Sequence, residues 1–175
     1  MPAETQQMLK RERFKPSTSG GVDGITVDTN VAKITLSGLK KDGLLISEVF
    51  AKLGTLGVNV DIIVHDKPED DLTMKLGFTI ARTDLEAAKK AITLLVRDNG
   101  YLDIKVAAET GLAKVSVVGV GMKEYAGIAG KTFSALASHG IDINMISTSE
   151  IKISVVIEDV DAERAIGVLY QAFVS

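Results

Sequence analysis

Apolar and polar residues alternate along several short stretches of the chain, which predicts β-strands. Residues 33–37 and 74–80 alternate in this way, and residues 115–117 and 151–155 repeat the pattern later in the chain. The apolar positions are Ile34, Leu36, Met74, Leu76, Phe78, Ile80, Val115, Val117, Ile151, Ile153 and Val155. Strict alternation is typical of strands in an antiparallel or mixed sheet that is covered on one face. We therefore expect an α+β fold with antiparallel sheets and helices on one face.

Four other stretches have a spacing of three and four residues, which predicts amphipathic helices. Their stripes are Ile46, Val49, Phe50 and Leu53; Leu85, Ala88, Ile92 and Val96; Ala129, Thr132, Phe133 and Leu136; and Ala162, Ala165, Leu169 and Phe173. We expect these stripes to belong to the hydrophobic core.

The chain contains two copies of one unit. Ala32–Gly38 aligns with Ala113–Gly119, and the match continues through the two helices of each copy. The later matches are Phe50, Leu53 and Gly57 with Phe133, Leu136 and Gly140, and Asp84, Glu86, Ala88 and Ile92 with Asp161, Glu163, Ala165 and Leu169. A duplicated unit of strand, helix, strand, strand and helix follows, with loops of different length.

We expect the first unit at residues 31–110 and the second at residues 111–175. The first closes with a fourth strand at residues 101–107, whereas the second ends just after its helix. A spare strand-like segment at residues 23–30 is predicted to complete the sheet of the second unit; a loose N-terminal segment is the alternative. Residues 1–22 lack the apolar stretch of a secretory signal, and we expect a flexible tail.

Composition narrows the function classes. The 175 residues include 20 Lys and Arg against 23 Asp and Glu, and no cysteine. A net charge of −3 argues against a general nucleic-acid binder. Base stacking on the sheet is also disfavoured because Phe78 is the one aromatic residue expected on its central strands. We expect a cytoplasmic protein, without thiol chemistry and without a membrane association.

Residues suited to catalysis are scarce. His65 and His139 are isolated, and the acidic run Glu69–Asp71 is expected to be a solvated loop with only a weak metal signal. Gly119–Val120–Gly121 suggests a dinucleotide fingerprint, but Glu124 occupies the third glycine position. We prefer a tight loop whose backbone N–H groups bind a small carboxylate. No catalytic residue, metal or cofactor is expected.

Residues 117–123 and 143–155 strongly resemble the regulatory part of aspartate kinases, a tandem pair of ACT domains. The similarity covers roughly residues 24–173, and residues 146–155 are its most specific part. The resemblance implies two ferredoxin-like βαββαβ domains, ACT units that pair into side-by-side sheets as a homodimer, and threonine or lysine bound where units meet. It also implies a kinase catalytic domain or subunit as partner, and no phosphorylation of aspartate by this chain alone.

The resemblance also implies where an amino acid effector binds. The positions carried over are Lys41, Asp42, Leu44, Leu45, Ile46, Asn59, Val60, Asp61, His65, Ile128, Ala129, Asp142, Ile143, Ser149 and Glu150. The chain departs from the family pattern in three places: residues 41–46 lack the usual proline, His65 replaces a common glutamine, and Ala126 replaces a proline.

An amino acid effector is a zwitterion and needs donors for its carboxylate and acceptors for its ammonium group. Helix N-terminal amides near residues 44–46 and 128–129 are candidates for the carboxylate. Asp42, Asp61 and strand carbonyls are the candidates for the ammonium group, with Asn59 and His65 selecting the side chain. Asn59 and Asp61 are also explained if they simply end a strand. The alternative function is a structural or dimerisation subunit whose effector specificity is lost or altered.

Overall fold

The protein is represented by a computed structural model, which describes residues 10–14, 21–39, 43–66 and 73–174. Contacts divide the chain into two compact units. We call residues 31–110 the central unit, and the segments up to residue 30 and from residue 111 onward together form the terminal unit. Within the described ranges, no helix is long and apolar enough to span a membrane.

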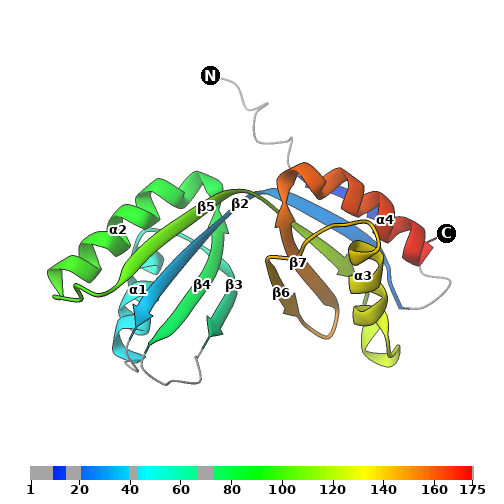
Figure 1. The fold of residues 1–175 in the computed structure, drawn as a ribbon. Helices are drawn as coiled ribbons and strands as arrows, with labels where there is room; N and C mark the ends of the chain where they lie inside the picture. The colour runs from blue at the N-terminus through cyan, green and yellow to red at the C-terminus, as the bar shows by residue number, and fades with distance from the viewer. Residues whose placement is uncertain (1–9, 15–20, 40–42, 67–72, 175) are drawn as a thin grey trace. The chain divides into compact units, whose positions relative to one another are not determined.

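The central unit has the order strand, helix, strand, strand, helix, strand. It contains the second part of β2 (Gly24–Leu39), α1 (Gly43–Thr55), β3 (Val60–Asp66), β4 (Met74–Ala81), the short 3-10 helix η2 (Arg82–Asp84), α2 (Leu85–Asp98) and the first part of β5 (Lys105–Val118). Its strands lie in the order β3-β4-β2-β5, with β4 antiparallel to both β2 and β3. Both helices pack on one face of this sheet (Figure 1).

The terminal unit repeats this arrangement with its own elements. After the second part of β5 come η3 (Met122–Glu124), α3 (Ile128–Ala137), β6 (Met145–Thr148), β7 (Lys152–Glu158), η4 (Asp159–Asp161) and α4 (Ala162–Val174). The first part of β2 supplies a further strand beside β5, so the strand order is β2-β5-β7-β6. The segment Gly24–Asn30 thus lies in the same unit as residues 111–175.

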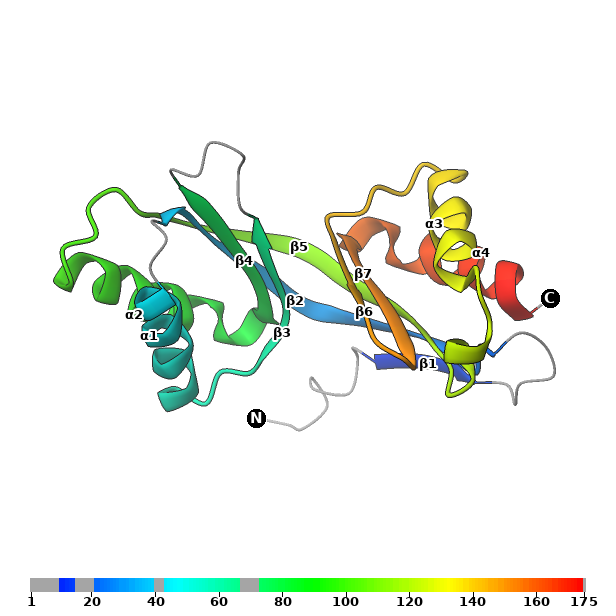
Figure 2. The ribbon, with the colours of Figure 1, turned by 90° about the horizontal axis from the view of Figure 1, so that it is seen from below.

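One strand lies before residues 23–30, within the part of the chain for which the sequence predicts a flexible tail. β1 (Lys10–Phe14) pairs antiparallel with β2, from Lys10 opposite Asp28 to Phe14 opposite Gly24 (Figure 2). Gly21 and Val22 are buried as well. The expected flexible tail through residue 22 is therefore wrong for these residues, because an available β2 edge supplies backbone hydrogen-bond partners that the local sequence does not reveal.

The strand predicted at residues 101–107 is shifted. Residues 101–104 form a turn, and β5 begins at Lys105 and continues without interruption to Val118. It thereby joins the strand that closes the central unit to the strand that opens the terminal unit. β2 is similarly long, with 16 residues. Apolar alternation does not mark such a join, because it is interrupted by polar residues that are not buried, at residues 28–30 of β2 and residues 109–110 of β5.

The predicted helical stripes form the two cores. In α2 the buried residues are Leu85, Ala88, Ile92 and Val96, as predicted from their spacing. The core of the central unit combines this stripe with residues of α1, β2 and β4, and Phe78 packs edge to face against Phe50 with 5.4 Å between ring centroids. The core of the terminal unit combines α3 and α4 with β2, β5 and β7. Full burial of a Val, Leu, Ile or Phe side chain contributes about 1.5–3 kcal/mol to the stability of the folded protein.

The expectation that each sheet is covered on one face only is wrong at β7. All five residues from Ile153 to Ile157 are buried. On the face away from the helices, the hydroxyl of Ser154 is hydrogen-bonded to that of Ser116 at 2.8 Å, and Val156 lies opposite Met145 in the neighbouring strand. In the sequence the two serines look like exposed polar positions. They can be buried because their hydroxyl groups form a hydrogen bond with each other.

Candidate functional site

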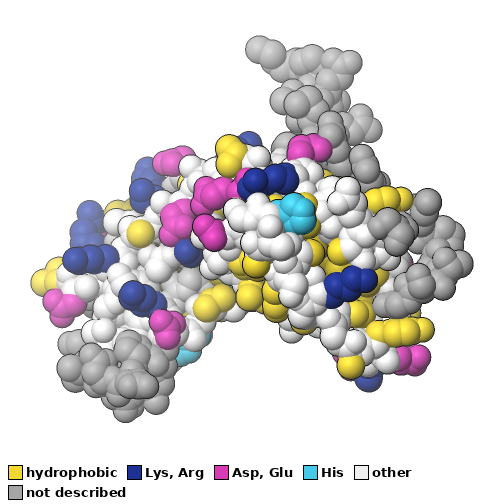
Figure 3. Space-filling view, turned by 45° about the vertical axis from the view of Figure 1, so that its right-hand side comes forward, with side chains coloured by type: hydrophobic (Ala, Val, Ile, Leu, Met, Phe, Trp, Pro, Cys, Tyr) yellow, Lys and Arg dark blue, Asp and Glu magenta, His cyan; other side chains and the backbone are white. Residues whose placement is uncertain are grey.

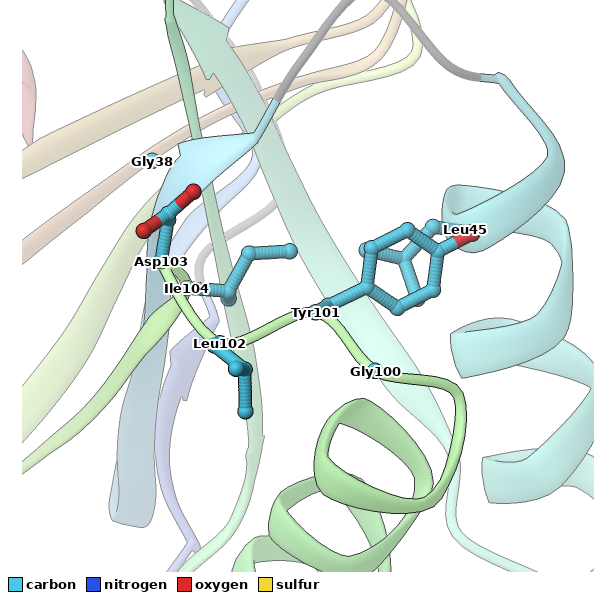
Figure 4. Close-up of a pocket in the computed structure, with 7 residues that line it drawn as sticks. All are labelled: Gly38, Leu45, Gly100, Tyr101, Leu102, Asp103 and Ile104. Atoms are coloured by element: carbon cyan, nitrogen blue, oxygen red, sulfur yellow. The ribbon is translucent and has the colours of Figure 1, made fainter.

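One hollow in the central unit lies at the end of the sheet where β2 finishes and α1 begins. Its cavity of about 140 Å³ is lined by Gly38 of β2, Leu45 of α1 and the loop residues 100–104 (Figure 4). The loop starts directly after α2, where the Tyr101 N–H donates to the Val96 carbonyl and closes the helix. Two helix ends and one strand end therefore fix the walls of this cavity.

The cavity has apolar walls and an acidic rim. Figure 4 shows Tyr101 and Ile104 directed toward Leu45, while Leu102 points away and the Asp103 carboxylate lies beside Gly38. Leu45 is fully buried, and Tyr101 and Ile104 are half-buried. An apolar cavity of roughly 150 Å³ has room for a benzene-sized group. This arrangement suits a small molecule with an aliphatic part and a cationic group.

Only part of the predicted effector set lies at this end of the central unit. Leu44, Leu45 and Ile46 form the first turn of α1, and His65 lies level with Leu36 because both are in register with Leu76. His65 is exposed on β3, the outermost strand. Amide groups in the first turn of a helix favour a nearby carboxylate, so this end has donors as well as the Asp103 acceptor.

The other predicted residues of the central unit lie at the opposite end of its sheet. Val60 is in register with Ile80, and Asn59 and Asp61 flank it. A bulge follows Val60, where the Ile62 N–H donates to the buried Thr79 hydroxyl at 3.0 Å. Val60 and His65 are five positions apart along β3, or roughly 15 Å. Within this unit, Asn59–Asp61 and the start of α1 therefore do not form one site.

Sequence reasoning missed the loop that makes half of the cavity. The sequence predicts a strand over residues 101–107, whereas residues 101–104 form the loop. The available signal was Asn99–Gly100, a pair typical of a turn after a helix. Lys41 and Asp42 of the predicted site, and the acidic run Glu69–Asp71, lie outside the described residues. Among the described side chains, no group of three His, Asp or Glu lies close enough to hold a metal ion.

Residues 119–127 connect β5 to α3 in the terminal unit, and we call them the glycine loop. One backbone amide of this loop binds a carboxylate that comes from the chain itself. The Val120 N–H donates to Oδ2 of Asp23 at 2.8 Å. The Gly119 N–H donates to the Ile151 carbonyl, and the Lys123 ammonium group forms a 3.0 Å ion pair with Glu150. The loop is thus joined both to the segment before β2 and to the β6–β7 turn. The sequence predicts that backbone N–H groups of this loop bind a small carboxylate. In the structure, one of these groups binds the side-chain carboxylate of Asp23.

The predicted residues of the terminal unit also divide between two ends. Ile128 and Ala129 begin α3, and Ser149 and Glu150 form the β6–β7 turn, at the end of the unit that carries the glycine loop. Asp142 and Ile143 precede β6 at the other end, where the Asn144 N–H donates to the Val156 carbonyl. The exposed apolar residues Val120, Tyr125 and Ile151 lie near the glycine loop, and Figure 3 shows hydrophobic and charged side chains side by side there, at the lower right.

Comparisons with known proteins agree with this architecture. The sequence profile of the ACT domain matches residues 115–173, which cover most of the terminal unit after Gly111. The crystal structure of the ligand-free regulatory subunit of aspartate kinase from Thermus thermophilus superposes with a TM-score of 0.80 at 32% identity, covering 87% of this chain and 99% of that one. The chain belongs to the family of aspartate kinase regulatory subunits.

Other relatives in this family match the same region. A structure of aspartokinase alpha and beta subunits has a TM-score of 0.77 at 34% identity and covers 87% of this chain and 98% of that chain. The aspartokinase of Helicobacter pylori is 40% identical over 152 residues, which are 87% of this chain. This chain spans about a third, 36%, of that curated relative. The resemblance seen in the sequence is therefore confirmed as a regulatory ACT region of aspartate kinase.

Proposed function

We propose that this chain binds an amino acid of the aspartate family, threonine or lysine, and mediates feedback inhibition of an aspartate kinase. The observation that carries the proposal is the near-complete coverage of the Thermus thermophilus regulatory subunit at 32% identity. The chain supplies no residues that we assign to phosphoryl transfer, so the catalytic domain or subunit is proposed as a partner. An effector that couples to it by about 1–3 kcal/mol changes activity several-fold or more.

The cavity at the start of α1 is the proposed place for the effector in the central unit. Its apolar walls, formed by Leu45, Tyr101 and Ile104, suit the aliphatic part of threonine or lysine. The Asp103 carboxylate at the rim is placed to accept from an ammonium group, and the first-turn amides of α1 to donate to a carboxylate. Asn59, Val60 and Asp61, at the other end of the sheet, are proposed to contact an effector bound by a second copy of the chain.

The finer description of the fold belongs to the same proposal. We propose that each unit is one ferredoxin-like βαββαβ ACT domain, with the fourth strand of the terminal unit supplied by the first part of β2. The protein is proposed to act as a cytoplasmic homodimer. The alternative is a structural subunit that dimerises without responding to any amino acid, and the binding experiment below separates the two.

Thermal unfolding with threonine, lysine or methionine tests effector binding. At a hundredfold excess over its dissociation constant an effector adds about 2.7 kcal/mol, which raises the Tm of a protein of this size by about 5–10 °C. One or two of the amino acids should produce a shift that saturates. If none does, the chain is a structural subunit rather than an effector-binding one.

Two variants test the place of binding. Ile104→Trp fills the cavity and should abolish the shift in Tm. Asp103→Asn removes the charge at the rim and should raise the dissociation constant of the effector by about tenfold. Glu86→Gln is the matched control, because Glu86 is an exposed acidic residue in the first turn of α2 and does not line the cavity. An unchanged shift in Ile104→Trp would remove the cavity from the proposal.

A further inference from the structure

The residue immediately before the fourth strand differs in kind between the two units. In the central unit this residue is Ile104, which precedes β5 and faces the cavity. In the terminal unit it is Asp23, which precedes β2 and reaches the glycine loop. The repeated glycine aligns the two units: a Cβ on Gly38 would meet the Asp103 carbonyl and the Ile104 Cα, and a Cβ on Gly119 would meet the Gly21 carbonyl and the Val22 Cα. Asp23 therefore corresponds to Lys105, so the terminal unit places a carboxylate on a backbone amide where the central unit carries a lysine.

The Asp23 contact is held by the surrounding backbone. The Asp23 N–H donates to the Val118 carbonyl at 2.7 Å, while its Oδ2 accepts from Val120 two residues further on. Two residues earlier, Gly21 packs so closely on Gly119 that a Cβ on Gly119 would overlap the Gly21 carbonyl oxygen. A carboxylate fixed in this way forms a charge-assisted hydrogen bond at little additional entropic cost.

We propose that Asp23 is a built-in ligand of the Gly119–Gly127 loop, whose carboxylate occupies the position that a free monocarboxylate would take. Because Asp23 is part of the chain, its effective concentration at Val120 exceeds that of a dissolved competitor. The terminal unit consequently does not bind a small carboxylate at this loop, and replacing Asp23 opens the position. This inference goes beyond the proposed function and does not depend on the effector bound by the central unit.

Acetate is the probe that tests the proposal, because it carries the carboxylate and nothing else that an effector needs. In Asp23→Ala of the full chain, the Val120 amide resonance should shift saturably as acetate replaces chloride at constant ionic strength. In the wild type the apparent affinity at Val120 should be weaker by at least about tenfold. Asp23→Asn keeps an acceptor oxygen and should behave like the wild type.

Thermal unfolding supplies a second readout. Asp23→Ala should lower the Tm by about 3–6 °C in chloride, as expected for the loss of a charge-assisted hydrogen bond in a protein of this size, and acetate should restore most of this loss. Asp23→Ser, which lacks the carboxylate and whose oxygen is one bond closer to the backbone, repeats the test if the alanine variant does not fold. Asp28→Ala is the control, since Asp28 accepts from the Asn30 N–H in the same strand and has no contact with the loop.

Two results would overturn the proposal. One is a Val120 amide that titrates with acetate equally in the wild type and in Asp23→Ala, which would show that Asp23 does not compete. The other is an Asp23→Ala or Asp23→Ser variant that folds but shows no saturable response, which would show that the loop has no carboxylate position. Neither result involves threonine, lysine or a kinase, so both are distinct from a failure of the proposed function.

Discussion

At the scale of single residues, contacts between backbone segments set the tightest limits on which residue a position can hold. Gly119 lies against Gly21, whose carbonyl carbon would be 2.8 Å from an added Cβ. The carbonyl carbon and the carbonyl oxygen of Gly21 are backbone atoms, so no side-chain rotation can relieve the overlap. The alignment of Ala113–Gly119 with Ala32–Gly38 identified this glycine as part of a repeat, but the partner that requires it lies nearly a hundred residues earlier in the chain.

Gly119→Ala is expected to reduce the free energy of unfolding by about 1–3 kcal/mol, because the segment before β2 must move away from the loop. Gly130→Ala is the control: Gly130 lies within α3, where an added Cβ meets nothing within 4 Å. That change should stabilise the protein by about 0.5–1 kcal/mol. Urea unfolding of both variants measures the difference, and equal stabilities would contradict the close approach.

The buried hydroxyl pair of the terminal unit is a second test at this scale. Ser116→Ala removes the partner of Ser154 and should cost about 1–3 kcal/mol, because one hydroxyl is left buried without a hydrogen bond. The double variant Ser116→Ala/Ser154→Ala should be more stable than the sum of the two single losses predicts. A double-mutant cycle from chemical unfolding gives the coupling, and strict additivity would show that the two hydroxyls do not interact.

At the scale of elements, amphipathic helices fix the two cores. The stripe of α2 is buried at each position that its spacing predicted, and the alternate residues of β4 face it across the core. The ion pair of Lys33 with Glu109 bridges β2 and β5 at 3.1 Å, but it is partly exposed and contributes at most about 1 kcal/mol. Packing therefore dominates the stability of these elements.

Ile92→Ala should lower the free energy of unfolding by about 2–5 kcal/mol, since Ile92 is fully buried at the centre of the α2 stripe. Lys89→Ala, on the exposed face of the same helix, should stay within about 0.5 kcal/mol of the wild type. Circular dichroism during urea unfolding measures both. A small effect of Ile92→Ala would mean that α2 is not packed as described.

At the scale of the whole molecule, each unit has an edge strand with exposed apolar residues. These are Ile63 and Val64 on β3 and Ile146 on β6, which are 53%, 39% and 46% exposed. Exposed strand edges of this kind favour pairing with another chain. The proposed homodimer would use them to extend the sheets.

Charged residues at these edges should weaken the proposed dimer. Ile146→Lys and Val64→Lys are each expected to shift the protein toward a monomer in light scattering, because a lysine at a paired edge must be desolvated. Val160→Lys is the control, since Val160 is 85% exposed in η4 and lies on no strand. A dimer that resists both edge variants would exclude pairing through β3 and β6.

The sequence by itself determined the periodicities, and with them most of the elements. The stripe of α2, the alternating strand β4 and the duplicated order of elements follow from spacing, because hydrophobic burial acts on every residue of a helix or strand in the same way. The family resemblance at residues 143–155 was likewise visible in the sequence and is confirmed. The proposed effector residues remain a prediction.

Only the tertiary structure decided which of these elements meet. The cavity beside Leu45 depends on a loop after α2, and β1 depends on an edge of β2. The contact of Asp23 with Val120 joins residues 97 positions apart. A hydrogen bond or a cavity needs particular groups at a particular distance. Local sequence does not encode that distance, because it is set by how the chain folds back on itself.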